Sequence, residues 1–589
     1  MNTPQDYYKN HIKTYAAKAK KLKKQMLVLS MLRLLVFVLS GLGIYIVFYQ
    51  WAIVGVVAIV GIALFLFLLL WYNKTKSQKA FYEALVYINE EELKIASGNF
   101  HHRDMGNQFQ NPKHAYSLDV DLFGRGSLFQ YINRTTIAEG TLKLANCLLA
   151  NNTSHIGLRQ EAVKELGGKT QWRQFYTATA SLVHVETPAN QIIQWLQNHK
   201  PLIPKAMRFV PVVFGTISIL LLGLIIFKFI NAAFFGYWLM VGLGISGIYV
   251  KKINQLSLYA DKLRDTFKQY AKLLDLIENE TFSSELLKQK QQQIQQKEKK
   301  ASVVFSELSR ALDALDNRNN LISALFGNGY FLVDIKNTYR IERWIQAHGN
   351  KVADWFEVVS FFEAYNSLGG FTFNHPDFVF PKIVANASVI KAEALGHPLL
   401  NKTKRVNSDV VIDNKQFFIV TGANMAGKST FLRTISLHIV MANTGLPVCA
   451  KSSTYNPVKL ITSMRTVDSL TDDSSYFFSE LTRLKYIVDT IKPEPYFVIL
   501  DEILKGTNST DKAIGSRKFV EKLVALQATG IIATHDLSLC DIENELNEVK
   551  NYYFDAQIIN NELFFDYKLK QGICQNMNAS FLLKKMDIV

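Results

Sequence analysis

Two long apolar blocks constrain the folding of this 589-residue chain most strongly. One covers residues 34–72 with a short polar break at 49–51, and the other covers 209–250 with a break at 228–231. Each block is about twice the ~20 residues that a membrane-spanning helix needs, which favours a helical hairpin in each. Buried soluble helices are the alternative, whereas the first block is too long for a cleaved signal peptide. The sequence therefore predicts four membrane spans in two hairpins.

Basic residues flank both blocks outside the predicted hairpins, while the loops inside them carry only Lys228. The flanking residues are Lys13, Lys18, Lys20, Lys21, Lys23, Lys24, Lys74, Lys76, Lys79, Lys205, Arg208, Lys251 and Lys252. By the positive-inside rule, both termini and the segment between the hairpins face the cytoplasm. The sequence thus predicts a multi-pass protein of the cytoplasmic (inner) membrane.

The formal net charge of +16 predicts an anionic partner, either nucleic acid or the anionic cytoplasmic leaflet, and charge alone does not separate the two. The lysine-rich leader fits a helix near the lipid head groups, or equally a solvated charged tail. The four cysteines are widely scattered without metal-ligand spacing, which is typical of reduced thiols in the cytosol.

A phosphate-binding pattern follows the apolar run 416–420 and precedes a helical segment. Its residues are Gly422, Ala423, Asn424, Met425, Ala426, Gly427, Lys428, Ser429 and Thr430. Glycines let the backbone curl so that amide groups and a helix N-terminus face phosphates. Lys428 can then reach the β and γ oxygens, and the Ser429 hydroxyl can ligate Mg²⁺. This context between strand and helix predicts a nucleoside triphosphate site.

Two further strands are predicted to end in polar residues beside this loop. The run 496–500 ends in Asp501 and Glu502, and the run 529–534 ends in His535. The carboxyl ends of parallel strands share one edge of a sheet, where ligands bind. Asp501 is the candidate Mg²⁺ ligand, and Glu502 is the candidate to orient or deprotonate the attacking water. His535 is the candidate to sense the γ-phosphate, against the alternative of an ordinary surface histidine.

The motifs 421–433, 500–507 and 533–535 resemble the ATPase domain of the MutS family, with the Asn424-Met425 pair as the most telling part. The resemblance covers roughly residues 115–205 and 255–575, strongly from 396 onward and weakly before. The resemblance implies an α/β P-loop NTPase of the ABC-type/MutS-like class at the C-terminus, preceded by an all-α core. It also implies ATP and Mg²⁺ as cofactors and a homodimer with composite sites. Ser475 would reach the γ-phosphate of the other subunit, and Asn508 would lie in the loop that joins the two sites.

The chain also departs from the family pattern. No N-terminal mismatch-reading module is recognisable, and the segment 402–407 offers no aromatic residue to stack on a base. Double-stranded DNA is the expected partner by resemblance, with generic basic candidates at 288–300 and at Lys164, Lys169 and Arg173. The alternatives are an ABC-type transport ATPase fused to its spans, or a membrane scaffold that uses ATP as a switch. This chain contains no Leu-Ser-Gly-Gly-Gln signature and has four rather than six predicted spans, which argues against the transport ATPase.

These features divide the chain into six segments. They are a basic leader (1–25), a first transmembrane hairpin (26–72), a cytoplasmic helical insert (73–206), a second hairpin (207–250), a helical core or lever (251–386) and a MutS-like ATPase domain (387–589). The Gln- and Lys-rich stretch 288–300 is expected to be a solvated helix or a tip between helices.

Overall fold

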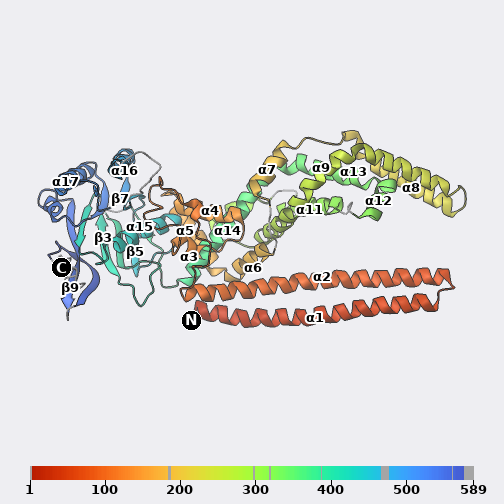
Figure 1. Ribbon diagram of the computed structural model, residues 1–589, viewed down its shortest axis with the longest axis horizontal. Helices are drawn as coiled ribbons and strands as arrows, with labels where there is room; N and C mark the ends of the chain where they lie inside the picture. Colours follow the sequence, from red (N-terminus) through yellow and green to blue (C-terminus); the bar gives the residue numbers. More distant parts are fainter. Residues whose placement is uncertain are drawn as a thin grey trace.

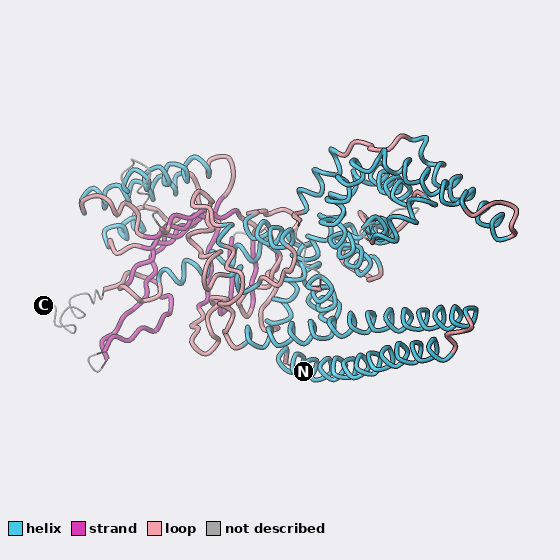
Figure 2. The backbone as a smooth tube through the Cα atoms, turned by 45° about the vertical axis from the view of Figure 1, so that its right-hand side comes forward, coloured by secondary structure: helices cyan, strands magenta, loops and turns pink. Residues whose placement is uncertain are grey.

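The computed structural model describes residues 3–182, 187–295, 299–316, 320–385, 388–465, 476–559 and 562–575. The molecule is elongated, with an α/β region at one end and two helical hairpins that project from the other side of a helical middle part (Figure 1). All strands gather at the C-terminal end, and the rest of the described chain is helical (Figure 2). This confirms the predicted order of a mostly helical N-terminal region and a C-terminal α/β domain.

The first hairpin consists of two very long helices, α1 (Pro4–Ile46) and α2 (Trp51–Ala96). A capping box between Thr3 and Asp6, with proline in the first turn, starts α1. The distal halves expose large apolar side chains; Phe37 and Leu70, for example, are each 70% exposed. A continuous apolar surface of this length is rare on a soluble monomer. The lysine-rich leader and the first apolar segment are thus parts of one helix.

The second hairpin pairs α8 (Val210–Ile226) with the start of α9 (Ala233–Glu278). In both views its tip points in the same direction as that of the first hairpin (Figures 1 and 2). By length and composition, α1, α2 and the segment Ala233–Tyr259 of α9 can cross a membrane, whereas α8 is a shorter apolar helix of 17 residues. Of the four spans predicted from the sequence, α8 is the shortest, and its length is at the lower limit of about 17 residues for a membrane-spanning helix.

A short apolar helix, α12 (Leu321–Phe331), packs against the second hairpin and was not singled out from the sequence. A Cβ atom on Gly242 of α9 would lie 2.2 Å from the carbonyl oxygen of Gly329, so the two backbones touch closely at this point. Trp238 donates a hydrogen bond to the Ser218 hydroxyl at 2.8 Å. The hydroxyl of Ser218 in turn donates to the Tyr330 carbonyl at 2.6 Å, which joins all three helices.

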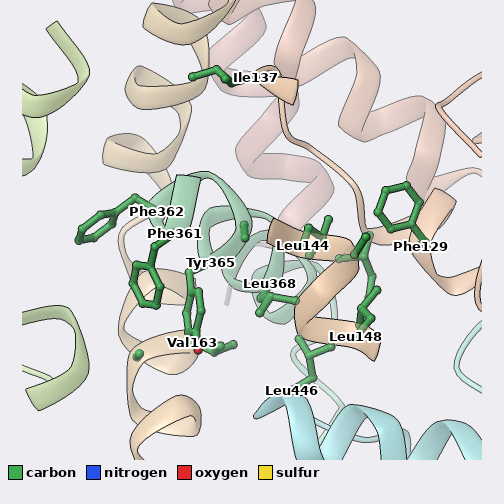
Figure 3. Close-up of a cluster of buried hydrophobic side chains, with 14 of the residues drawn as sticks. Phe129, Ile137, Leu144, Leu148, Val163, Phe361, Phe362, Tyr365, Leu368 and Leu446 are labelled. Atoms are coloured by element: carbon green, nitrogen blue, oxygen red, sulfur yellow. The ribbon is translucent and has the colours of Figure 1, made fainter. Parts of the chain in front are cut away.

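The middle of the molecule is a helical core around α14 (Val352–Asn374). Its other helices are α3 (Leu128–Ile132), α4 (Ala138–Leu149), α5 (Ile156–Gly168), α6 (Thr170–Ser181), α7 (Ala189–Asn198), α10 (Glu285–Gln292), α11 (Ala301–Asp316) and α13 (Val333–His348). Every residue of α14 from Val358 to Phe371 is buried, because helices cover it on all sides. Figure 3 shows Phe361, Tyr365 and Leu368 of α14 beside Leu144 of α4 and Leu446 of the α/β region.

The α/β domain contains a six-stranded sheet in the order β10-β9-β4-β8-β7-β6, which is parallel except for β10. Its strands are β4 (Phe417–Gly422), β6 (Lys459–Ser463), β7 (Tyr496–Asp501), β8 (Thr529–Ala533), β9 (Val549–Ile559) and β10 (Glu562–Gln571). A smaller sheet has the order β1-β5-β2-β3, with β1 (Lys382–Ile383), β2 (Ser388–Leu395), β3 (Ser408–Asp413) and β5 (Ser452–Tyr455). The helices are α15 (Lys428–Thr444), α16 (Tyr476–Ile491) and α17 (Ser509–Ala525). The strands β4, β7 and β8 are almost wholly apolar and buried, as expected inside a parallel sheet.

Candidate nucleotide-binding site

Three adjacent strands deliver the predicted site residues to one edge of the large sheet. β8 lies between β4 and β7, and its Ala533 is level with Val420 on one side and Asp501 on the other. Two backbone hydrogen bonds extend this register beyond the strands, from the Glu502 amide to the Ala533 carbonyl (2.9 Å) and from the Thr534 amide to the Val420 carbonyl (3.0 Å). The loop 422–430, the acidic pair and His535 are therefore held side by side.

The loop between β4 and α15 has the backbone shape that its glycines permit. Gly422 and Gly427 have φ values of 147° and 109°, and Met425 adopts a φ of 67°. A Cβ atom on Gly422 would lie 2.7 Å from the carbonyl oxygen of Phe554, so a side chain cannot fit there. The first amide groups of α15 have no acceptor within the helix, as at every helix start, and they carry its positive dipole end. This is an anion-binding arrangement.

Lys428 lies folded over the same loop. Its ammonium nitrogen donates to the carbonyl oxygens of Gly422 (2.8 Å) and Ala423 (3.1 Å). Burial lowers the pKa of Lys428, while the nearby carboxylates of Asp501 and Glu502 act in the opposite direction. The ammonium group is thus positioned at the mouth of the loop, where the phosphates of a nucleotide would lie.

Ser429 and Asp501 form the pair of oxygen ligands that a magnesium ion requires. The Ser429 hydroxyl donates to a carboxylate oxygen of Asp501 at 2.8 Å, which places two hard oxygen atoms side by side. Burial raises the pKa of Asp501, and the hydrogen bond from Ser429 partly opposes that shift. A Mg²⁺ ion usually binds through one or two carboxylates, water and substrate phosphates, so these residues fit it.

Glu502 and His535 face each other across the end of β8. The His535 Nε2 atom lies 3.0 Å from a Glu502 carboxylate oxygen and 3.2 Å from the Lys428 ammonium nitrogen. Burial, together with Lys428, lowers the pKa of His535, so the ring is neutral at pH 7. A neutral Nε2 either donates to Glu502 or accepts from Lys428, so its tautomer decides which partner it binds. Glu502 has a φ of 48°, a strained conformation that turns its side chain off the strand.

Glu480 binds the backbone of the loop that follows Asp501 and Glu502, here called the acidic loop. The sequence alone did not assign a role to this residue. This residue of α16 is 3% exposed and accepts hydrogen bonds from the backbone amides of Leu504 (2.5 Å) and Lys505 (3.1 Å). Burial raises the pKa of its carboxyl group, and those two hydrogen bonds oppose the shift. The only signal in the sequence was an acidic residue on the face of α16 that carries Leu484 and Ile487.

Two further residues were predicted from the family resemblance. Ser475 lies outside the described residues. Asn508 is exposed and caps the N-terminus of α17, where its side-chain oxygen accepts from the Asp511 amide at 2.8 Å. Their expected roles at the site of a second subunit therefore stay predictions.

A cavity of about 380 Å³ adjoins the loop at Gly427 and Thr430. Aromatic side chains of Phe431, Phe554 and Tyr567 line it. Its size suits a small ligand, and flat aromatic walls suit a nucleotide base. The segment 402–407, where the family resemblance places a stacking residue, contains no aromatic side chain. The aromatic walls of the cavity come instead from Phe554 of β9 and Tyr567 of β10. These strands lie more than a hundred residues further along the chain, so local sequence carried no signal for them.

The basic residues proposed for DNA contact differ in how far they are engaged inside the protein, and Lys164 is exposed. Arg173 is 7% exposed and donates from Nε to the Leu166 carbonyl at 2.7 Å, so it is not available to a phosphate backbone. Lys169 forms an ion pair with Glu280 at 2.6 Å. In the stretch 288–300, Lys290 pairs with Glu357 at 2.8 Å, whereas Lys288, Lys299 and Lys300 are exposed, in agreement with the expected solvated stretch.

Known proteins are similar to the C-terminal region of this chain. The family model described as MutS domain V matches residues 418–584. MutS protein homolog 4 from Homo sapiens is 34% identical over 194 residues, which cover 31% of this chain and 20% of that protein. The DNA mismatch repair protein MutS of Methanococcoides burtonii is 33% identical over 205 residues, covering 33% of this chain and 23% of the relative. The matched region thus spans about a fifth to a quarter of these relatives. The C-terminal region 418–584 of this chain is thus similar to MutS domain V.

Proposed function

We propose that this protein is a membrane-anchored, Mg²⁺-dependent ATP hydrolase that works as a homodimer. The observation that carries the proposal is the convergence of Lys428, Ser429, Asp501, Glu502 and His535 on one sheet edge, within 2.8–3.2 Å of at least one other member of the group. These are the groups that phosphoryl transfer to water needs: a cation, a metal-binding pair, a base and a polar partner.

Each side chain has a distinct task in this proposal. The amides of the loop and Lys428 hold the β- and γ-phosphates and stabilise the charge that develops on them. Mg²⁺, when bound at Ser429 and Asp501, would neutralise phosphate oxygens. Glu502 orients the attacking water and accepts its proton, which is the role of a carboxylate general base. His535, neutral at pH 7, binds either Glu502 or Lys428 through its Nε2 atom, according to its tautomer.

The membrane anchor is supported by the exposed apolar surfaces of the two hairpins. Both hairpins project in the same direction, away from the α/β domain (Figure 1). A band of exposed apolar side chains runs from Leu27 in α1 to Trp71 in α2. Lysines lie shortly before this band in α1 and shortly after it in α2. This pattern orients the ATPase domain and both termini toward the cytoplasm.

The homodimer and a DNA partner rest on likeness alone. Matched relatives are named as DNA mismatch repair proteins, which makes double-stranded DNA the first effector to test. The burial of Arg173 leaves fewer candidate DNA contacts in the helical core. An ABC-type transporter and an ATP-switched scaffold make different predictions, because neither requires duplex DNA to change the rate of hydrolysis.

ATP hydrolysis by the detergent-purified full-length protein tests the proposal. Lys428→Ala should abolish turnover, whereas Lys518→Ala, the same change on the exposed face of α17, should retain it. Glu502→Gln should bind ATP but hydrolyse it at least about 100-fold more slowly, and it should accumulate as a dimer. Wild-type turnover in Lys428→Ala would refute the site, and a monomer of Glu502→Gln in saturating ATP would refute the dimer. Adding homoduplex or mismatched DNA to the wild type separates the DNA-dependent function from its alternatives.

A further inference from the structure

A second cavity lies far from the nucleotide site, at the base of the first hairpin. Its volume is about 570 Å³, and α1, α2, α6 and α9 line it. Three lysines contribute to its wall: Lys18 and Lys21 from α1, and Lys272 from α9. The cavity therefore joins the first hairpin to the helix that continues from the second one.

The charge of this cavity is uncompensated. Among the described residues that line it, none is Asp or Glu. The Lys18 ammonium is held over the ring of Tyr82, 5.2 Å from its centroid. Burial and the like charge of Lys268 lower the pKa of Lys272. Three ammonium groups around one space repel each other, and an anion between them would remove that cost.

The remaining lining groups suit a phosphate ester with an apolar tail. The Ser77 hydroxyl and the Gln78 side-chain amide can donate to phosphate oxygens. Leu22 and Phe81 add apolar wall beside them. The volume lies in the range of about 300–1,000 Å³ that small-ligand sites occupy.

The cavity also lies at the right depth below the apolar band. The band begins at Leu27 in α1, and Lys21 precedes it by six residues, or about 9 Å along the helix. In α2 the band ends at Trp71, and Ser77 follows by the same six residues, again about 9 Å. The head-group layer extends roughly 5–8 Å beyond the hydrocarbon on each side of a bilayer. Lys21 and Ser77 thus both lie near the outer edge of the head-group layer, and Gln25, two residues before Leu27, brings the α1 wall of the cavity into that layer.

We infer that this cavity binds the phosphate-bearing head group of an anionic phospholipid from the cytoplasmic leaflet. The inference rests on the proposed membrane anchoring. A lipid in this position contacts α1 and α2 on one side and α9 on the other. It therefore ties the first hairpin to the helix that leads from the core into the second hairpin.

Binding of short-chain lipids to the full-length protein in detergent tests this inference. The probes are dihexanoylphosphatidylglycerol, dihexanoylphosphatidylcholine, inorganic phosphate and a DNA duplex, and the readout is the dissociation constant from the shift in thermal unfolding. The site variant combines Lys18→Gln, Lys21→Gln and Lys272→Gln. The control combines Lys13→Gln, Lys20→Gln and Lys24→Gln, three exposed lysines of α1 that do not line the cavity.

We expect phosphatidylglycerol to bind the wild type and the control with affinities within about twofold of each other, and the site variant at least tenfold more weakly. Equal loss in site variant and control would refute a built site in favour of diffuse charge attraction. Equal binding of inorganic phosphate or DNA at the same lysines would refute the lipid assignment. Retained ATP hydrolysis by the site variant shows that it is folded. Alkaline carbonate extraction of membranes separates the two proposals: release of the wild type refutes the anchor, whereas a retained wild type that binds no phosphatidylglycerol refutes only the lipid site.

Discussion

Glu363 makes the stability of the helical core depend on pH. It lies in the middle of α14, is 2% exposed, and accepts hydrogen bonds from the backbone amides of Thr136 (2.7 Å) and Ile137 (3.2 Å) at the start of α4. A Cβ atom on Gly140 would lie 2.4 Å from that of Glu363, so the two helices leave no room for water between them at this point. Burial raises the pKa of Glu363 to about 7, more than the hydrogen bonds lower it.

The sign of the effect follows from proton linkage. Below pH 4.5 the carboxyl group is protonated in both the folded and the unfolded chain, and above pH 7 it is ionised in both. Between these values the folded chain holds a proton that the unfolded chain has lost, so the free energy of unfolding decreases as pH rises. A difference of about 2.5 pKa units corresponds to about 3 kcal/mol. Stability from this group is therefore present below pH 4.5 and lost by about pH 7.

Glu363→Gln keeps the shape of the side chain and an acceptor oxygen but cannot ionise. Relative to wild type, we expect it to be more stable at pH 8 by up to about 3 kcal/mol, reduced by about 1 kcal/mol for the weaker hydrogen bonds. Hydrogen exchange of the amides in α4 at pH 5.5 and pH 8, corrected for intrinsic rates, measures this locally, because a chain of several parts does not unfold in two states.

Glu357→Gln on the same helix is the matched control. Glu357 is ion-paired with Lys143 and Lys290, and its pKa is lowered, with the hydrogen bonds from those lysines outweighing burial. Its contribution changes only below pH 4.5, so this variant should keep the wild-type slope between pH 5.5 and pH 8. If Glu363→Gln shows that same slope, the carboxyl group of Glu363 is not the source.

Four further outcomes follow from contacts in the nucleotide site and at the far end of α15. Glu480→Ala leaves two backbone amides of the acidic loop without their acceptor, so it should lower kcat at least about tenfold while ATP binding is retained. Glu480→Gln keeps one acceptor oxygen and should lower kcat less. Equal kcat values in the two variants would show that these hydrogen bonds do not matter for hydrolysis. Gly445 has a φ of 87°, and a Cβ atom added there would lie 2.6 Å from that of Arg159. Gly445→Ala should therefore destabilise the protein by about 1–3 kcal/mol in thermal unfolding. The control Gly157→Ala should have little effect, because no atom lies within 4 Å of the added Cβ atom. His535→Gln should slow hydrolysis about 10- to 100-fold. Because burial lowers the pKa of His535, the wild-type rate should be flat from pH 7 to 8, and a steep change there would contradict a neutral ring.

Local patterns in the sequence predicted the parts of the nucleotide site that lie next to strand ends. The loop 422–430, Asp501–Glu502 and His535 each follow an apolar strand, and parallel strands bring their carboxyl ends to one edge. Glu480 and Glu363 escaped prediction because their partners lie 24 and more than 220 residues away. An acidic residue within a helix has no local feature that reveals burial. The same limit explains Arg173, whose charge suggested a DNA contact although its side chain lies inside the core.

The packing between the nucleotide loop and the second hairpin is continuous along rigid elements. α15 begins at the loop with Lys428, and near its other end the Asn443 carbonyl accepts a hydrogen bond from Arg159 of α5 at 3.0 Å. α5 packs along α14, and Phe356 of α14 stacks near Tyr270 of α9 with ring centroids 4.2 Å apart. α9 then runs as one helix from the core into the apolar segment that starts at Ala233. Close-packed helices pass displacements on because they resist compression, whereas a flexible linker would absorb them. We therefore expect a movement of α15 on ATP binding to displace α9, which would couple the nucleotide site mechanically to the proposed membrane segment.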